Sequence, residues 1–134
     1  MPIEPRALHG RWPLVAAGFL LAAATALGAM GAHALKSQLS PERLAIYDTA
    51  VRYHFLHALG LLAIGILLRT LDSDLLRWSA IAIVAGIVLF SGSLYLLTFG
   101  LDPGSARIVG LATPLGGLLL IAGWVVFAVA MLRL

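Results

Sequence analysis

The most distinctive chemistry in this sequence lies in its histidines. His33 ends an apolar run, and His54 and His57 lie together in the next one. A spacing of i,i+3 on a helix lets two imidazoles approach one ligand. We therefore expect these three side chains to cluster in a candidate polar site. The polar side chains expected to complete its lining are Tyr47, Tyr53, Ser91 and Ser93.

Several interpretations of this site remain open. One interpretation is a site for a small polar ligand or a proton. Another is a metal site, for which Tyr47, Asp48 or Tyr53 would have to supply a third ligand, although none of them lies at a spacing typical of metal ligands. A haem would need axial ligands across the helices, which His33 and His57 are placed to supply. The alternative is that the histidines only bond backbone or serine groups near the membrane surface. We assign no cofactor and leave the metal open.

The composition indicates which kind of protein positions these groups. Hydrophobic residues make up 61% of the 134 residues and charged residues 11%, whereas soluble domains average about 45–50% apolar and about 25% charged residues. The chain is therefore expected to lie in a lipid bilayer. The net charge of +3 is spread thinly, so nucleic acid is excluded as a partner. The absence of cysteine excludes disulfides and thiolate chemistry.

Four apolar runs are long enough to cross a bilayer, which needs about 20 residues for each span. They predict an all-α fold, an integral membrane bundle of four transmembrane helices in a single domain, residues 1–134. The predicted helices are residues 13–35, 41–71, 75–100 and 106–132. The first run is too long for the apolar region of a signal peptide. The first part of the second helix, residues 41–53, is amphipathic and is expected to lie in the interface as an extension of the span.

Helix starts are marked by capping residues. Ser40 is expected to cap the second helix, with Pro41 in its first turn. Ser73 or Asp74 is expected to cap the third helix, and Ser105 the fourth. Farther along the second helix, Asp48 and Arg52 are spaced i,i+4, and we expect them to form an ion pair on the aqueous side.

Small residues are expected to hold the bundle together, since they let helix backbones approach closely in a membrane. Gly28, Gly31, Gly92 and Gly117 are predicted to face inward. A kink is expected near Pro114. The full set assigned to helix packing is Gly28, Gly31, Gly92, Thr113, Pro114, Gly116 and Gly117.

Four blocks of the sequence resemble a known family. They are LGAMGAHALK (27–36), TAVRYHFLHALGLL (49–62), LFSGSLYLL (89–97) and TPLGGLLLIAGW (113–124). In this order and spacing they resemble the domain of unknown function 423 family of small bacterial inner-membrane proteins, with a eukaryotic relative called transmembrane protein 256. The resemblance implies a four-helix membrane protein and supplies no catalytic residues to carry over.

The sequence favours a structural or accessory membrane protein that associates with itself or with a larger membrane complex through small-residue helix faces. The alternative is a small-molecule or ion binding or transport protein with its site around His33, His54 and His57. No catalytic motif is present, so we do not expect an enzyme. The expected location is the bacterial inner membrane as a multi-pass protein. A small excess of Lys and Arg on the side of the termini predicts that both termini are cytoplasmic.

Overall fold

The structure, a computed structural model, describes residues 10–134. Within this range it contains four long α-helices, one short π-helical segment and no strand. They are α2 (Arg11–Met30), η1 (Gly31–Leu35), α3 (Pro41–Leu67), α4 (Asp74–Thr98) and α5 (Pro103–Arg133). Each of the four long elements, with η1 extending α2, is long and apolar enough to cross a membrane. The predicted all-α membrane fold with four spanning helices is confirmed.

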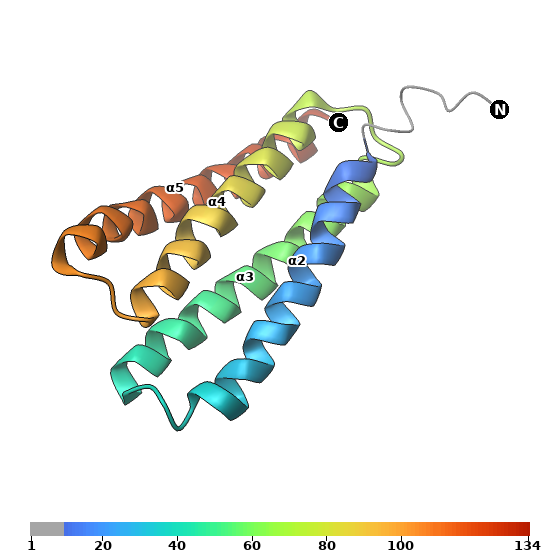
Figure 1. The fold of residues 1–134 in the computed structure, drawn as a ribbon. Coiled ribbons are helices and arrows are strands. Elements are labelled where there is room, and N and C mark those ends of the chain that lie inside the picture. Colours follow the sequence, from blue (N-terminus) through green and yellow to red (C-terminus); the bar gives the residue numbers. More distant parts are fainter. Residues whose placement is uncertain (1–9) are drawn as a thin grey trace.

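The helices pack in the order in which they follow one another along the chain. The main interfaces join α2 to α3, α3 to α4 and α4 to α5, and α2 forms no comparable interface with α5. Figure 1 shows the resulting pair of hairpins, α2 with α3 and α4 with α5. The two outer helices therefore leave wide apolar faces toward the membrane, with side chains such as Phe19 and Ile121 exposed.

The second predicted helix is one uninterrupted α-helix, α3. Ser40 caps it by accepting a hydrogen bond from the backbone N–H of Arg43, and Pro41 occupies the first turn, as predicted. Its 27 residues span about 40 Å, which exceeds the roughly 30 Å of hydrocarbon in a bilayer. The first turns of α3 must therefore extend into the interface, so the expected extension and the span are parts of a single helix.

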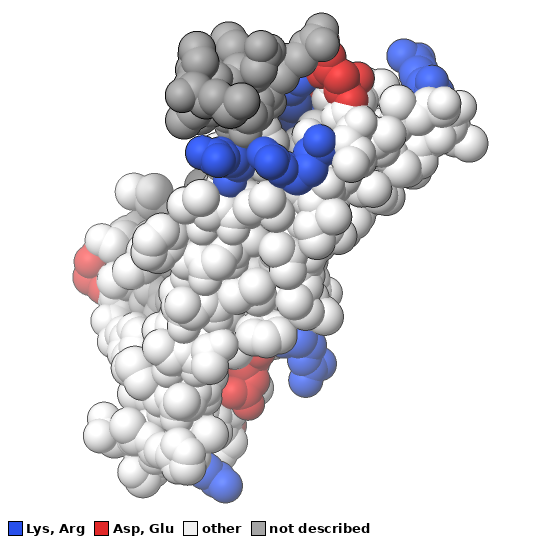
Figure 2. All heavy atoms as spheres, turned by 90° about the vertical axis from the view of Figure 1, so that its right-hand side faces the viewer, with Lys and Arg blue, Asp and Glu red and all other residues white. Residues whose placement is uncertain are grey.

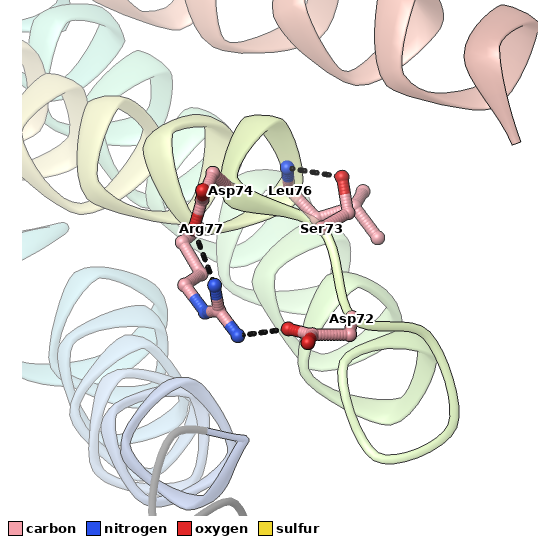
Figure 3. A network of polar contacts seen from close by, with 5 residues as sticks. All are labelled: Asp72, Ser73, Asp74, Leu76 and Arg77. Atoms are coloured by element: carbon pink, nitrogen blue, oxygen red, sulfur yellow. Dashed lines mark hydrogen bonds and ion pairs between the residues drawn. The ribbon is translucent and has the colours of Figure 1, made fainter.

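The turn between α3 and α4 is held by a small polar network (Figure 3). Ser73 is the cap of α4 and accepts a hydrogen bond from the backbone N–H of Leu76. The guanidinium group of Arg77 forms ion pairs with both Asp72 and Asp74. Of the two predicted caps, Ser73 and Asp74, the serine fills the position, while the aspartate lies in the first turn.

The predicted cap of the last helix is wrong. Asp102, not Ser105, caps α5, and its carboxylate accepts a hydrogen bond from the backbone N–H of Ser105. Pro103 then occupies the first helical position, where its missing N–H costs nothing. Hydrogen bonding from Ser105 also holds the pKa of the Asp102 carboxyl below its ordinary value. The helix begins earlier than predicted because an Asp-Pro pair is itself a strong start signal.

Glycines set the distance between α4 and α5. A methyl group built on Gly116 would lie 2.8 Å from the Cα of Phe90 and closer still to its nitrogen, so the two backbones nearly touch. Gly86 meets Leu120, and Gly123 meets Ile83. These contacts permit the close interface between the two helices.

The four glycines predicted to face inward divide into two groups. Gly31 of η1 lies against Tyr47, and Gly28 of α2 lies against Val51, so both face α3. Gly117 is only in ordinary contact with Phe90, and nothing lies within 4 Å of the position that a side chain on Gly92 would take. The prediction for Gly92 is wrong because its direction on α4 is set by the neighbouring Ser91 and Ser93, which face the partner helices.

Candidate functional site

Tyr47 anchors the polar part of the interior. Its side chain is completely buried, and its hydroxyl donates a 2.6 Å hydrogen bond to the carbonyl oxygen of Leu27 on α2. The ring lies in the space left open by Gly31, where a methyl group would stand 2.7 Å from the ring. It also makes an edge contact with Tyr95 of α4 at a centroid distance of 5.5 Å. One side chain of α3 thus joins α2 to α4.

His54 lies two turns farther along α3 and is 5% exposed. Its Nδ1 atom is 3.0 Å from the hydroxyl oxygen of Tyr95. When Tyr95 donates the proton of that bond, the ring proton resides on Nε2. Nε2 is buried and has no hydrogen-bond partner, although the backbone of Leu20 on α2 lies near the ring. His54 is therefore a buried polar group with one half of its hydrogen-bonding capacity unused.

Ser91 and Tyr95 form the side of this region that belongs to α4. The Ser91 hydroxyl donates a 2.8 Å hydrogen bond to the carbonyl oxygen of Ala50, one turn before His54. Side chains on a helix lean toward its N-terminus, so Tyr95 reaches back toward His54. Tyr95 was not among the predicted site residues. Its position four residues after Ser91 and three before Thr98, in an otherwise apolar helix, is the signal that indicates a shared polar face.

His57 lies in a different environment. Its Nδ1 donates to the carbonyl oxygen of Tyr53 in the same helix at 2.8 Å, and its ring stacks on the ring of Tyr53. The ring centroid of Trp124 from α5 lies 6.2 Å from that of His57, and its indole covers Gly60. Tyr53 itself is 40% exposed and rests on Phe90. These residues form a partly open aromatic cluster rather than a lining for His54.

The predicted clustering of the three histidines is not found. Among residues 10–134 no group of three His, Asp or Glu side chains is arranged to hold a metal ion. His33 is exposed on η1, His54 is buried toward α4, and His57 faces the aromatic cluster. Ser93 also lies elsewhere, because its hydroxyl is 2.7 Å from that of Thr113 at the interface of α4 with α5. The residues brought together are Tyr47, His54, Ser91 and Tyr95, which we call the buried polar cluster.

Removing the Tyr95 hydroxyl should destabilise the buried polar cluster. Tyr95→Phe leaves both ring nitrogens of His54 unpaired, and we expect the free energy of unfolding to fall by about 1–2 kcal/mol. Unfolding in mixed micelles, followed by circular dichroism, measures this change. The matched control is Tyr53→Phe, since the Tyr53 hydroxyl makes no hydrogen bond within the described chain. An equal loss in both variants would contradict the importance of the His54–Tyr95 bond.

Comparison with known proteins places the chain among bacterial membrane proteins. Residues 27–117 match the family described as "Protein of unknown function (DUF423)". The UPF0382 membrane protein SERP0230 of Staphylococcus epidermidis is 41% identical over 110 residues, which cover 82% of the chain and 86% of that relative. No solved structure gives a significant match.

Two further relatives come from other bacteria. The UPF0382 membrane protein YwdK of Bacillus subtilis is 39% identical over 111 residues, which cover 82% of the chain and 87% of the relative. The UPF0382 inner membrane protein YgdD of Escherichia coli is 34% identical over 109 residues, which cover 81% of the chain and 80% of the relative. These relatives and the family pattern match most of the chain. The chain therefore belongs to the DUF423 family of integral membrane proteins.

Proposed function

We propose that this protein is a structural or accessory membrane protein, without enzymatic activity, that associates with a second copy or with a larger membrane complex. The observation that carries the proposal is an uncovered small-residue face on α2. We define the α2 outer face by its members at helical spacing, Gly18, Ala22, Thr25 and Ala29, all of which are exposed. Helix association within lipid depends on close packing of small residues, so this face is suited to a partner helix.

The small-residue face between α4 and α5 is already used inside the chain. Gly86, Gly116 and Gly123 are in contact between α4 and α5. On α2, by contrast, nothing lies within 4 Å of the position that a side chain on Gly18 would take. The hydroxyl of Thr25 donates to the carbonyl oxygen of Leu21, so the face has no unmet polar group. A partner helix could therefore approach it closely without a desolvation cost.

A binding or transport role at the histidines has less support. The three side chains have separate surroundings, and His57 bonds its own helix. A proton-coupled carrier commonly keeps a carboxylate deep in a spanning helix, and this sequence carries none in the middle of its apolar runs. The accessory role also fits the buried polar cluster, whose hydroxyl groups bond atoms of the chain itself.

Cross-linking in native membranes tests the proposal. The chain has no cysteine, so Ala22→Cys introduces a unique thiol on the α2 outer face. We expect a disulfide or thiol-specific adduct at about twice the mass of the chain for a second copy, or at another discrete mass for a different partner. Adding Gly18→Leu and Ala29→Leu should reduce the adduct about tenfold, because bulky side chains separate the helices.

The control places the thiol on the opposite outer helix. Val125 of α5 is 57% exposed, similarly accessible in the membrane, and lies far from α2 along the row of helices. Val125→Cys should give little adduct. Equal cross-linking from both positions would indicate random collision, and an adduct that survives the two leucines would show that the α2 outer face is not the contact.

A further inference from the structure

A groove lined by small, apolar and charged residues opens at the end of the first hairpin. It has a volume of about 400 Å³ and lies between the end of α2 with η1 and the first turns of α3. Part of its lining is made by small residues, Gly28, Gly31 and Ala32, and part by Leu44 and Val51. Three charged side chains surround it: Lys36, Asp48 and Arg52. A volume of this size falls within the range of small-ligand sites.

The charges in this groove are not paired with one another. The predicted ion pair of Asp48 with Arg52 is wrong, because no oxygen of Asp48 lies within ion-pair distance of Arg52, and Lys36 has no acidic partner within the described residues. All three side chains are exposed, and an exposed pair gains too little to hold two long side chains together. The groove therefore offers two cationic groups and one carboxylate to an outside ligand.

The position of the groove relates it to the membrane surface. The 20 residues of α2 rise about 30 Å, which is the thickness of the hydrocarbon layer, so η1 and Lys36 lie at its edge. Arg52 lies deeper along α3, and a long arginine side chain extends its guanidinium toward the headgroups. Figure 2 shows acidic and basic side chains next to one another on the lower part of this face, separated by uncharged surface from the charged groups at the top.

Beyond Arg52, toward the C-terminus of α3, the same side of the helix becomes apolar. Leu56 and Leu59 follow at helical spacing and are both exposed. The surface thus presents charge at the level of lipid headgroups and an apolar strip toward the middle of the bilayer. This order matches the two parts of a phospholipid.

We propose that the groove binds an aminophospholipid, with the lipid phosphate between Lys36 and Arg52 and the lipid ammonium group at Asp48. Charge complementarity selects this occupant: a phosphate needs the cations, and a primary ammonium supplies donors to the carboxylate. A quaternary ammonium offers no N–H donor, and an anionic headgroup without an amine would face Asp48 unfavourably. The acyl chains then lie along Leu56 and Leu59. This inference does not depend on the proposed accessory function.

Lipid titration of the delipidated protein tests the site. Native mass spectrometry would compare phosphatidylethanolamine, phosphatidylcholine and phosphatidylglycerol of identical acyl chains. We expect phosphatidylethanolamine to bind most tightly. Asp48→Asn should weaken its binding about tenfold and that of phosphatidylcholine much less, and Arg52→Gln should weaken binding of all three about tenfold.

Matched variants keep the test specific. Glu42→Gln and Arg107→Gln remove exposed charges outside the groove and should leave lipid preference unchanged, while Asp48→Glu keeps the carboxylate and should retain the preference. Competition by soluble phosphoethanolamine distinguishes binding of an intact lipid from binding of a free headgroup. Equal binding of the three lipids, a preference that survives Asp48→Asn, or full competition by phosphoethanolamine at the lipid's own concentration would each overturn the proposal.

Discussion

Gly116→Ala should lower the free energy of unfolding by about 2–4 kcal/mol, a large effect for one methyl group. The methyl would lie 2.8 Å from the carbonyl carbon of Leu89 and from the Cα of Phe90. Since these are backbone atoms, no side chain can rotate away, and α4 and α5 must separate. Separation would also lengthen the 2.8 Å bond from Ser79 to the carbonyl oxygen of Gly123.

Two neighbouring glycines provide the controls for this variant. Gly117→Ala would place its methyl 3.7 Å from the Phe90 ring, an ordinary contact, and Gly110→Ala would meet nothing within 4 Å. Because alanine favours a helix over glycine by about 1 kcal/mol, both controls should be neutral or slightly stabilising. Unfolding of the three variants in the same mixed micelles measures the difference. Similar stability of Gly116→Ala and Gly117→Ala would refute the close approach of the two backbones.

Tyr47→Ala should cost about 3 kcal/mol of unfolding free energy. The side chain is completely buried and contacts both Gly31 and Tyr95. Its loss leaves a cavity between three helices and removes the hydrogen bond to the Leu27 carbonyl oxygen. Tyr47→Phe keeps the ring and loses only that bond, so it should cost about 1 kcal/mol.

A double-mutant cycle with Gly31 identifies the contact. Gly31→Ala alone should destabilise by about 1–2 kcal/mol, because its methyl would lie 2.7 Å from the Tyr47 ring. In the Tyr47→Ala background the same change should cost almost nothing, which gives a coupling energy of about 1 kcal/mol or more. In the Tyr47→Phe background the penalty should remain. Simple additivity in the alanine cycle would mean that the ring does not occupy the space beside Gly31.

The number and type of elements followed from local properties of the chain. Four apolar runs of membrane-spanning length predicted the four helices, and Ser40 and Ser73 marked two of their starts. Capping depends on residues within one turn, and a span is a continuous apolar run of about 20 residues, so one sequence is enough to read both. The start of α5 was missed because Asp102 and Ser105 are equally good capping residues that lie close together, and Pro103 after Asp102 decides between them.

The composition of the buried polar cluster was predicted only in part. Tyr47, His54 and Ser91 were among the candidate residues, whereas Tyr95 was not, although it lies one turn from Ser91. His33, His57, Tyr53 and Ser93 were candidates that the fold directs elsewhere. On a helix, His54 and His57 differ by about 60° in direction, and that difference is enough to place one against α4 and the other beside Trp124 of α5.

The sequence by itself therefore determined a membrane protein of four helices, the residues available for polar contacts, and two of the three predicted helix caps. Only the tertiary structure decided which helices adjoin, which glycines are in close contact, and which polar groups meet. The reason is physical: rotation of each helix about its axis is set by packing against residues far away in the chain, such as Gly116 on Phe90 and Tyr47 beside Gly31. Small residues permit close approach on several sides of a helix, and the partner surfaces select the side that is used.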